Sequence, residues 1–234
     1  MELDPTHFYA LQARAPYQRG SREAQISQST IELGTLRIHS GAVEACDPFF
    51  DLGNGVRFQA PNGDHRAVVT VADVSGRQDG SHLRESYLSL LFSDAPTARL
   101  ALATPLLGPD EEEHTYSAWV GVETGTVAFT DRTVLQFMPD VNHYDELFDS
   151  GQPDSWFALM DNPHHIARYV ANIPLPLGQA GENLVLSHSG WGDGVYPVLA
   201  TYAADGNLTG LHIDLLVVND DASRKLDVDD EEDD

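Results

Sequence analysis

The sequence VLATYAADGNLTGLHIDLLVV, at residues 198–218, predicts the fold class of this chain. Two runs rich in β-branched and other apolar side chains, 198–202 and 208–218, flank the turn Asp205-Gly206-Asn207. An Asp-Gly pair between two such runs is a strong signal for a β-hairpin, because these residues tolerate positive φ. We therefore expect an antiparallel pair of strands here.

Short runs of the same kind continue upstream, separated by turn residues. They cover residues 33–38, 41–45, 67–74, 83–92, 97–103, 116–122, 126–130 and 184–187. Three pairs of neighbouring runs are joined at His39-Ser40, Asp94-Ala95-Pro96 and Glu123-Thr124-Gly125, and we interpret each pair as a hairpin. Residues 51–63 are rich in turn formers and are expected to be mostly turns. The pattern at 166–170 is ambiguous and does not distinguish helix from strand.

One stretch has a helical pattern. Thr130-Asp131 resembles a helix N-cap before a short helix that runs through Phe137 and ends at Pro139. Two further helical candidates follow at 141–148 and 155–160. The fold class predicted from these patterns is mainly β (α+β): an antiparallel sandwich or partly closed barrel with a short helical insertion near 131–160.

The chain has 234 residues, enough for a sizeable core. We expect an N-terminal lead-in at 1–30, with a short helix from Asp4-Pro5 and a polar loop over 20–30. Residues 31–218 are expected to form a single β-rich domain. The acidic segment 219–234 lacks aromatic residues and is predicted to be a disordered tail.

The charge is strongly negative: 37 acidic residues oppose 13 basic ones, a formal net charge of -24, and Lys225 is the only lysine. Such a field repels nucleic acid and anionic membranes. Three explanations remain open. The acidity is an adaptation to salt, a solvated surface without further purpose, or a face that binds a basic protein partner.

Other features bound the class of protein. No run of about 18 apolar residues predicts a membrane span, and the acidic start at Met1 lacks the basic and apolar regions of a signal peptide. The single Cys46 excludes an internal disulfide and a cysteine-based zinc site. We therefore expect a soluble, cytoplasmic protein.

The segment SGWGDGVYP, residues 189–197, combines three glycines with Trp191, Asp193 and Tyr196. It is called the signature segment below. Its glycines lack the strand-to-helix context of a phosphate-binding loop, because Pro197 disfavours a helix there. The segment is either a binding site or a tightly packed corner.

Several turns, taken in order, resemble a bacterial family, domain of unknown function 4241. The matching pieces are residues 33–36, Ser40-Gly41, Cys46-Asp47-Pro48, 92–96, 121–125 with Phe129 and Asp131, the signature segment, Asp205-Gly206 and Asp214. Glu123 stands where the family has Asp, and Leu215 where it has Phe. The resemblance covers about 31–218 and implies one compact domain, with the glycine-carboxylate turns as the part to test.

The candidate chemistry lies in the turn carboxylates. The candidate binding site consists of Trp191, Asp193, Tyr196, Asp47, Glu123, Asp131 and Asp214. If several carboxylates converge, they can bind a divalent cation through oxygen ligands or act in acid–base catalysis. The alternative is that each carboxylate holds its own turn through backbone amides.

No catalytic motif favours an enzyme. The ten histidines include no pair with metalloprotease spacing, and Asp47 beside Cys46 disfavours a reactive thiolate. The sequence therefore favours a non-enzymatic binding or protein-interaction module. The alternative is an enzyme or a divalent-cation site built from turn carboxylates around the signature segment.

Overall fold

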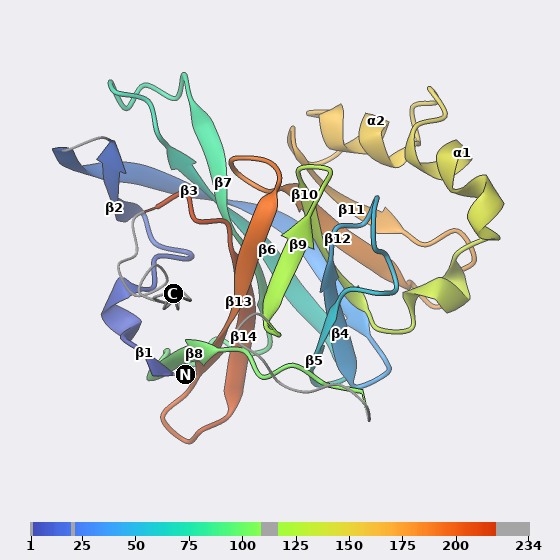
Figure 1. Ribbon diagram of the computed structural model, residues 1–234, viewed down its shortest axis with the longest axis horizontal. Coiled ribbons are helices and arrows are strands. Elements are labelled where there is room, and N and C mark those ends of the chain that lie inside the picture. Colours follow the sequence, from blue (N-terminus) through green and yellow to red (C-terminus); the bar gives the residue numbers. More distant parts are fainter. Residues whose placement is uncertain (1, 20–21, 109–116, 219–234) are drawn as a thin grey trace, which may run out of the picture.

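The computed structural model describes residues 2–19, 22–108 and 117–218. Within these residues, antiparallel strands form a nine-stranded and a five-stranded sheet (Figure 1). The first sheet is curled like half a barrel. The mainly β class, with a sandwich or partly closed barrel, is thus confirmed. The predicted tail at 219–234 lies outside the described residues.

The larger sheet has the strand order β1-β8-β13-β14-β7-β6-β3-β2, with β9 paired to β13. Its strands are β1 (Glu2–Leu3), β2 (Arg14–Arg19), β3 (Arg22–Ile38), β6 (Gly63–Asp73), β7 (Leu83–Leu91), β8 (Arg99–Leu102), β9 (Trp119–Val122), β13 (Gly194–Tyr202) and β14 (Leu208–Asp214). The smaller sheet has the order β11-β12-β10-β4-β5. Its strands are β4 (Ala42–Cys46), β5 (Val56–Gln59), β10 (Thr126–Asp131), β11 (Val170–Pro174) and β12 (Asn183–His188).

The C-terminal hairpin is confirmed, because β13 and β14 pair antiparallel with Val198 opposite Ile213. The other three predicted hairpins are wrong. β3 and β4 lie in different sheets, as do β9 and β10, and β7 is separated from β8 by β13 and β14. The apolar side chains of each strand must be buried. A chain that crosses from one sheet to the facing sheet buries them as well as a hairpin within one sheet does.

The helical insertion near 131–160 is confirmed. It contains the 3-10 turns η2 (Val134–Phe137) and η3 (Val141–His143) and the helices α1 (Tyr144–Phe148) and α2 (Trp156–Asp161). Both helices lie on the outer side of the smaller sheet, where α2 contacts β11 (Figure 1). Trp156 is buried there among Phe49 and Phe148.

Local predictions in the polar parts of the chain need correction. Residues 22–30 belong to the long strand β3, not to a loop, and Asp4-Pro5 starts only the 3-10 turn η1 (Pro5–His7). The predicted turn region 51–63 contains β5, and 166–170 leads into β11. β3 tolerates polar residues because neighbouring segments form hydrogen bonds with them. The side-chain amide of Gln28, for example, donates to the Tyr9 and Gln12 carbonyls.

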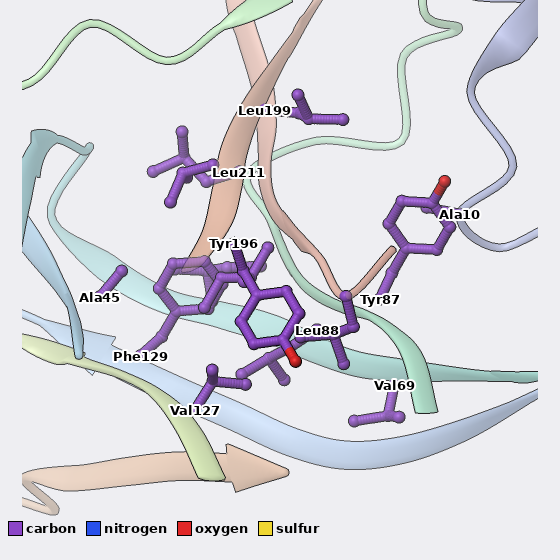
Figure 2. Close-up of a cluster of buried hydrophobic side chains, with 14 of the residues drawn as sticks. Ala10, Ala45, Val69, Tyr87, Leu88, Val127, Phe129, Tyr196, Leu199 and Leu211 are labelled. Carbon is purple, nitrogen blue, oxygen red and sulfur yellow. The ribbon is translucent and has the colours of Figure 1, made fainter. Parts of the chain in front are cut away.

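The main core lies between the two sheets. Leu88 of β7 is directed toward Tyr196 and Val127, whereas Tyr87 is directed toward Ala10 in the N-terminal segment (Figure 2). Neighbours in a strand point to opposite faces. β7 therefore separates the inter-sheet core from a second apolar layer formed with the N-terminal segment.

Candidate functional site

The signature segment is divided between a loop and a strand. Residues 189–193 connect β12 to β13, and the rest of the segment is the start of β13. Tyr196 is buried, and its hydroxyl donates to the Gly192 carbonyl over 2.6 Å, as does the Ser189 hydroxyl. Burial raises the pKa of Tyr196. Tyr196 therefore fixes the loop from its buried side, and Trp191 remains on the exposed side.

Gly190 seats this loop against β7. Its φ is +67°, and a Cβ atom there would lie 2.5 Å from Val217 Cγ2 and 2.7 Å from the Glu85 carbonyl oxygen. Only glycine fits both the left-handed backbone and this close approach. The approach brings the loop directly beside Glu85.

A cleft of about 400 Å³ opens at this contact. It is lined by Arg84 and Glu85 of β7, Thr124 and Gly125 of the β9–β10 turn, Tyr169, His188 and the loop 189–192. The cleft thus joins elements of both sheets with the loop half of the signature segment.

A β-bulge in β7 sets the direction of Glu85. Tyr87 is opposite Thr70 and Glu85 is opposite Val71, so Ser86 is the additional residue. The Ser86 hydroxyl bonds to Gln28, on the same side as Tyr87. Because strand neighbours alternate, Glu85 is directed to the opposite face, toward the second sheet. Without the bulge Glu85 would face the N-terminal segment.

Glu85 is a buried carboxyl group, with only 5% of its surface exposed. Burial raises its pKa from the usual 4.5 to about 7, although its own backbone amide and the charge of Arg84 act in the opposite direction. No basic side chain of the described residues forms a salt bridge to it within 4.0 Å. A buried carboxylate normally has a partner, so Glu85 is suited to receive one.

Two aromatic side chains form the walls. Trp191 is 50% exposed, has the Arg84 guanidinium carbon 5.3 Å from its ring centre and makes a T-shaped contact with His82. Tyr169 is 39% exposed and stacks on His188 with ring centres 4.6 Å apart. Burial lowers the pKa of His188, which favours its neutral form.

Tyr169 also has strained backbone. Its φ is +73°, a region that few residues other than glycine adopt. The chain holds it there through hydrogen bonds from Tyr169 N to the Met160 carbonyl and from His188 N to the Tyr169 carbonyl. Such strain concentrates at functional sites.

Asp47 is buried and holds the β9–β10 turn. Its carboxylate accepts hydrogen bonds from the Glu123 and Thr124 amides at 2.9 and 2.7 Å and from the Thr124 hydroxyl at 2.6 Å. The side chain of Glu123 is exposed. Asp47 thus positions Thr124 at the cleft without lining it.

Asp131 performs the same task at the other end of β10. Its carboxylate accepts hydrogen bonds from the His39 and Ser40 amides at 2.8 and 2.9 Å and from the Thr133 amide. Burial acts to raise the pKa of Asp131, but these hydrogen bonds outweigh it and the pKa is lowered. It lies opposite Val43, four residues from Asp47, or about 13 Å along the strand. Asp131 and Asp47 are therefore too far apart to share a cation.

Neither of the two remaining predicted carboxylates lines the cleft. Asp193 is exposed at the end of the loop, directly before β13, and Asp214 is buried where its carboxylate accepts from the Leu216 amide. Within residues 2–19, 22–108 and 117–218, no group of three or more His, Cys, Asp or Glu side chains is arranged to hold a metal ion. Of the predicted residues, Trp191 alone lines the cleft.

Sequence reasoning missed the residues that line the cleft with Trp191: Arg84, Glu85, Tyr169 and His188. One signal was available, because Arg84 and Glu85 are charged residues inside a run that otherwise reads as a buried strand. Charged side chains are rarely buried in such positions unless they are paired, so their presence there is informative. The strained backbone of Tyr169 had no counterpart in the sequence.

Residues 36–213 match the family model described as "Protein of unknown function (DUF4241)". The chain belongs to this family. The expected resemblance is confirmed, and the matched region includes every described residue that lines the cleft. No curated protein matches, and neither does any solved structure.

Both departures from the family pattern sit at structural positions. Glu123 uses its backbone amide to bond Asp47, and Leu215 is fully buried with its amide donating to the Ser86 carbonyl at the bulge. Neither change alters the cleft lining. In the described part of the chain, no helix has the length and apolar character needed to span a membrane.

Proposed function

We propose that this protein is a non-enzymatic binding module that holds a basic side chain of a protein partner in the cleft. The observation that carries the proposal is the Glu85 carboxyl group, which is buried at the cleft without a salt-bridge partner among the described residues. A cationic group close to it favours the ionised form and offsets the cost of burial.

The walls of the cleft suit a cation as well. Trp191 and Tyr169 present partly exposed aromatic rings, whose negative faces attract ammonium and guanidinium groups. Because the net charge is -24, the molecule attracts a basic partner over long distance. Long-range attraction and local recognition therefore favour the same class of ligand.

The enzymatic alternative has weaker support. In the described residues, no side chain is hydrogen-bonded to the Glu85 carboxylate, so the pairing of nucleophile and base is missing. The divalent-cation alternative lacks a group of converging carboxylates.

Binding to a defined basic peptide tests the proposal. The probe is Gly-Arg-Gly with blocked ends, and the readout is the indole N–H resonances of the three tryptophans in an NMR titration. We expect the Trp191 resonance to shift, while that of buried Trp156 stays in place as an internal reference. Glu85→Gln is expected to weaken binding about tenfold or more, since a buried charge pair is lost.

The matched control is Glu146→Gln, which makes the same chemical change at an exposed position of α1. It should weaken binding by less than about twofold, because the charge is distant and screened. Equal effects of both substitutions would show that only general electrostatic attraction is measured, and the proposed function would be wrong.

A further inference from the structure

Arg84 is held differently from Arg37 and Arg66, two other arginines of the same sheet. Arg37 forms two hydrogen bonds to Asp64 at 2.8 and 2.9 Å, and Arg66 is paired with both oxygens of Glu32. Within the described residues, no carboxylate forms a salt bridge to Arg84: its Nη1 donates to the Leu83 carbonyl next to it, and its buried Nε has no hydrogen-bond partner there. Its guanidinium rests on Trp191 instead.

This arrangement is notable in a chain with nearly three acidic residues for each basic one. A guanidinium carries five N–H donors in a planar fork that suits a carboxylate. Arg84 leaves that potential largely unused, although Glu85 is the next residue. Its guanidinium lies over the ring of the half-exposed Trp191, a contact that any planar cation can make.

We infer that the face of Trp191 is a guanidinium site, which Arg84 of this chain occupies in the structure and for which an arginine of the partner competes. The inference rests on the proposed function and specifies its ligand as arginine over lysine. An arginine side chain stacks flat on the ring and still directs N–H groups sideways, whereas an ammonium group makes only a point contact.

Substitutions of Arg84 test the competition with the blocked Gly-Arg-Gly peptide and its Gly-Lys-Gly counterpart. Arg84→Gln frees the indole face and is expected to tighten binding of the arginine peptide about two- to fivefold, the range of an exposed cation–π contact. Arg84→Lys keeps the charge but removes the planar group, and it should tighten the arginine peptide as well. The lysine peptide should gain less from either change.

Arg99→Gln is the matched control, because Arg99 also stacks on an aromatic ring, that of Tyr202 at 3.6 Å, but does not line the cleft. It removes the same charge and reports how much a less repulsive field contributes. Equal gains for Arg84→Gln and Arg99→Gln, or equal gains for both peptides, would overturn the inference. If Glu85→Gln still weakens binding in that case, the proposed function stands and only the role of Arg84 is wrong.

Discussion

A single additional residue decides where Glu85 points. The run at 83–92 alternates well enough to predict a strand, but alternation alone assumes an unbroken register. Leu88 lies on the inter-sheet side (Figure 2). The bulge at Ser86 reverses the faces on one side of it, so Glu85 is directed to that side as well. A bulge has no reliable sequence signal, and this is why the strand could be predicted and the cleft could not.

Protonation of Glu85 should make stability depend on pH. Its pKa rises from 4.5 to about 7 on folding, so the folded state binds more protons than the unfolded state between these values. Stability should therefore fall as the pH rises through this window, by on the order of 3 kcal/mol in total, and level off above it.

Urea unfolding of the wild type and of Glu85→Gln across that window measures this loss. The difference between the two proteins isolates Glu85, because Asp51, whose pKa burial raises to about 6, titrates equally in both. Parallel curves for the two proteins would show that Glu85 does not titrate as described.

Gly190 should be the least replaceable residue of the loop. Gly190→Ala introduces a methyl group that collides with Val217 and with the Glu85 carbonyl. Gly192→Ala has the same backbone problem, at φ +102°, but nothing within 4 Å. We expect a loss of about 1 kcal/mol for Gly192→Ala and at least about 2 kcal/mol more for Gly190→Ala, measured by chemical unfolding. Similar losses would mean that backbone strain, not close packing, fixes the loop.

At the scale of elements, buried carboxylates fix the turns that connect the two sheets, by accepting hydrogen bonds from the backbone amides of those turns. Asp47 holds the β9–β10 turn, and Asp131 holds the β3–β4 turn. The sequence predicted these turns and singled out both carboxylates, but it suggested hairpins and a shared site. The pairing of strands depends on contacts between distant residues, which local turn chemistry does not encode.

Loss of the Asp47 contacts should loosen the cleft from a distance. Asp47→Ala leaves two turn amides and the Thr124 hydroxyl without their acceptor, which should cost about 2–4 kcal/mol. Hydrogen exchange of the Glu123 and Thr124 amides should accelerate. Asp205→Ala is the control, because Asp205 accepts its hydrogen bonds from Asn207 within its own hairpin turn in the described structure. Unchanged exchange at Thr124 would contradict this role of Asp47.

At the scale of the whole molecule, the charge is the dominant property. With a net charge of -24, repulsion between like charges opposes compaction. We expect the melting temperature to rise between about 20 mM and about 1 M NaCl as the Debye length shortens from roughly 20 Å to roughly 3 Å. A melting temperature that does not change with salt, followed by calorimetry, would argue that the acidic residues are spaced widely enough not to interact.

The overall architecture was the part most accessible to sequence reasoning. Composition, turn spacing and the helical stretch before residue 160 were sufficient for the class, and the terminal hairpin was predicted from its Asp-Gly turn. The site was predicted only through Trp191. Its other residues come from four separated segments, and the fold alone brings them together.

A cation that binds next to Glu85 changes the pKa of this carboxyl group, so the pKa reports such binding directly. A pH titration of the Glu85 side-chain carboxyl carbon by NMR, with and without saturating blocked Gly-Arg-Gly peptide, gives both values. We predict a pKa of about 7 for the free protein and a decrease of about one unit or more with the peptide, since a nearby cation favours the carboxylate. An unchanged pKa in the presence of the peptide would contradict binding at this cleft.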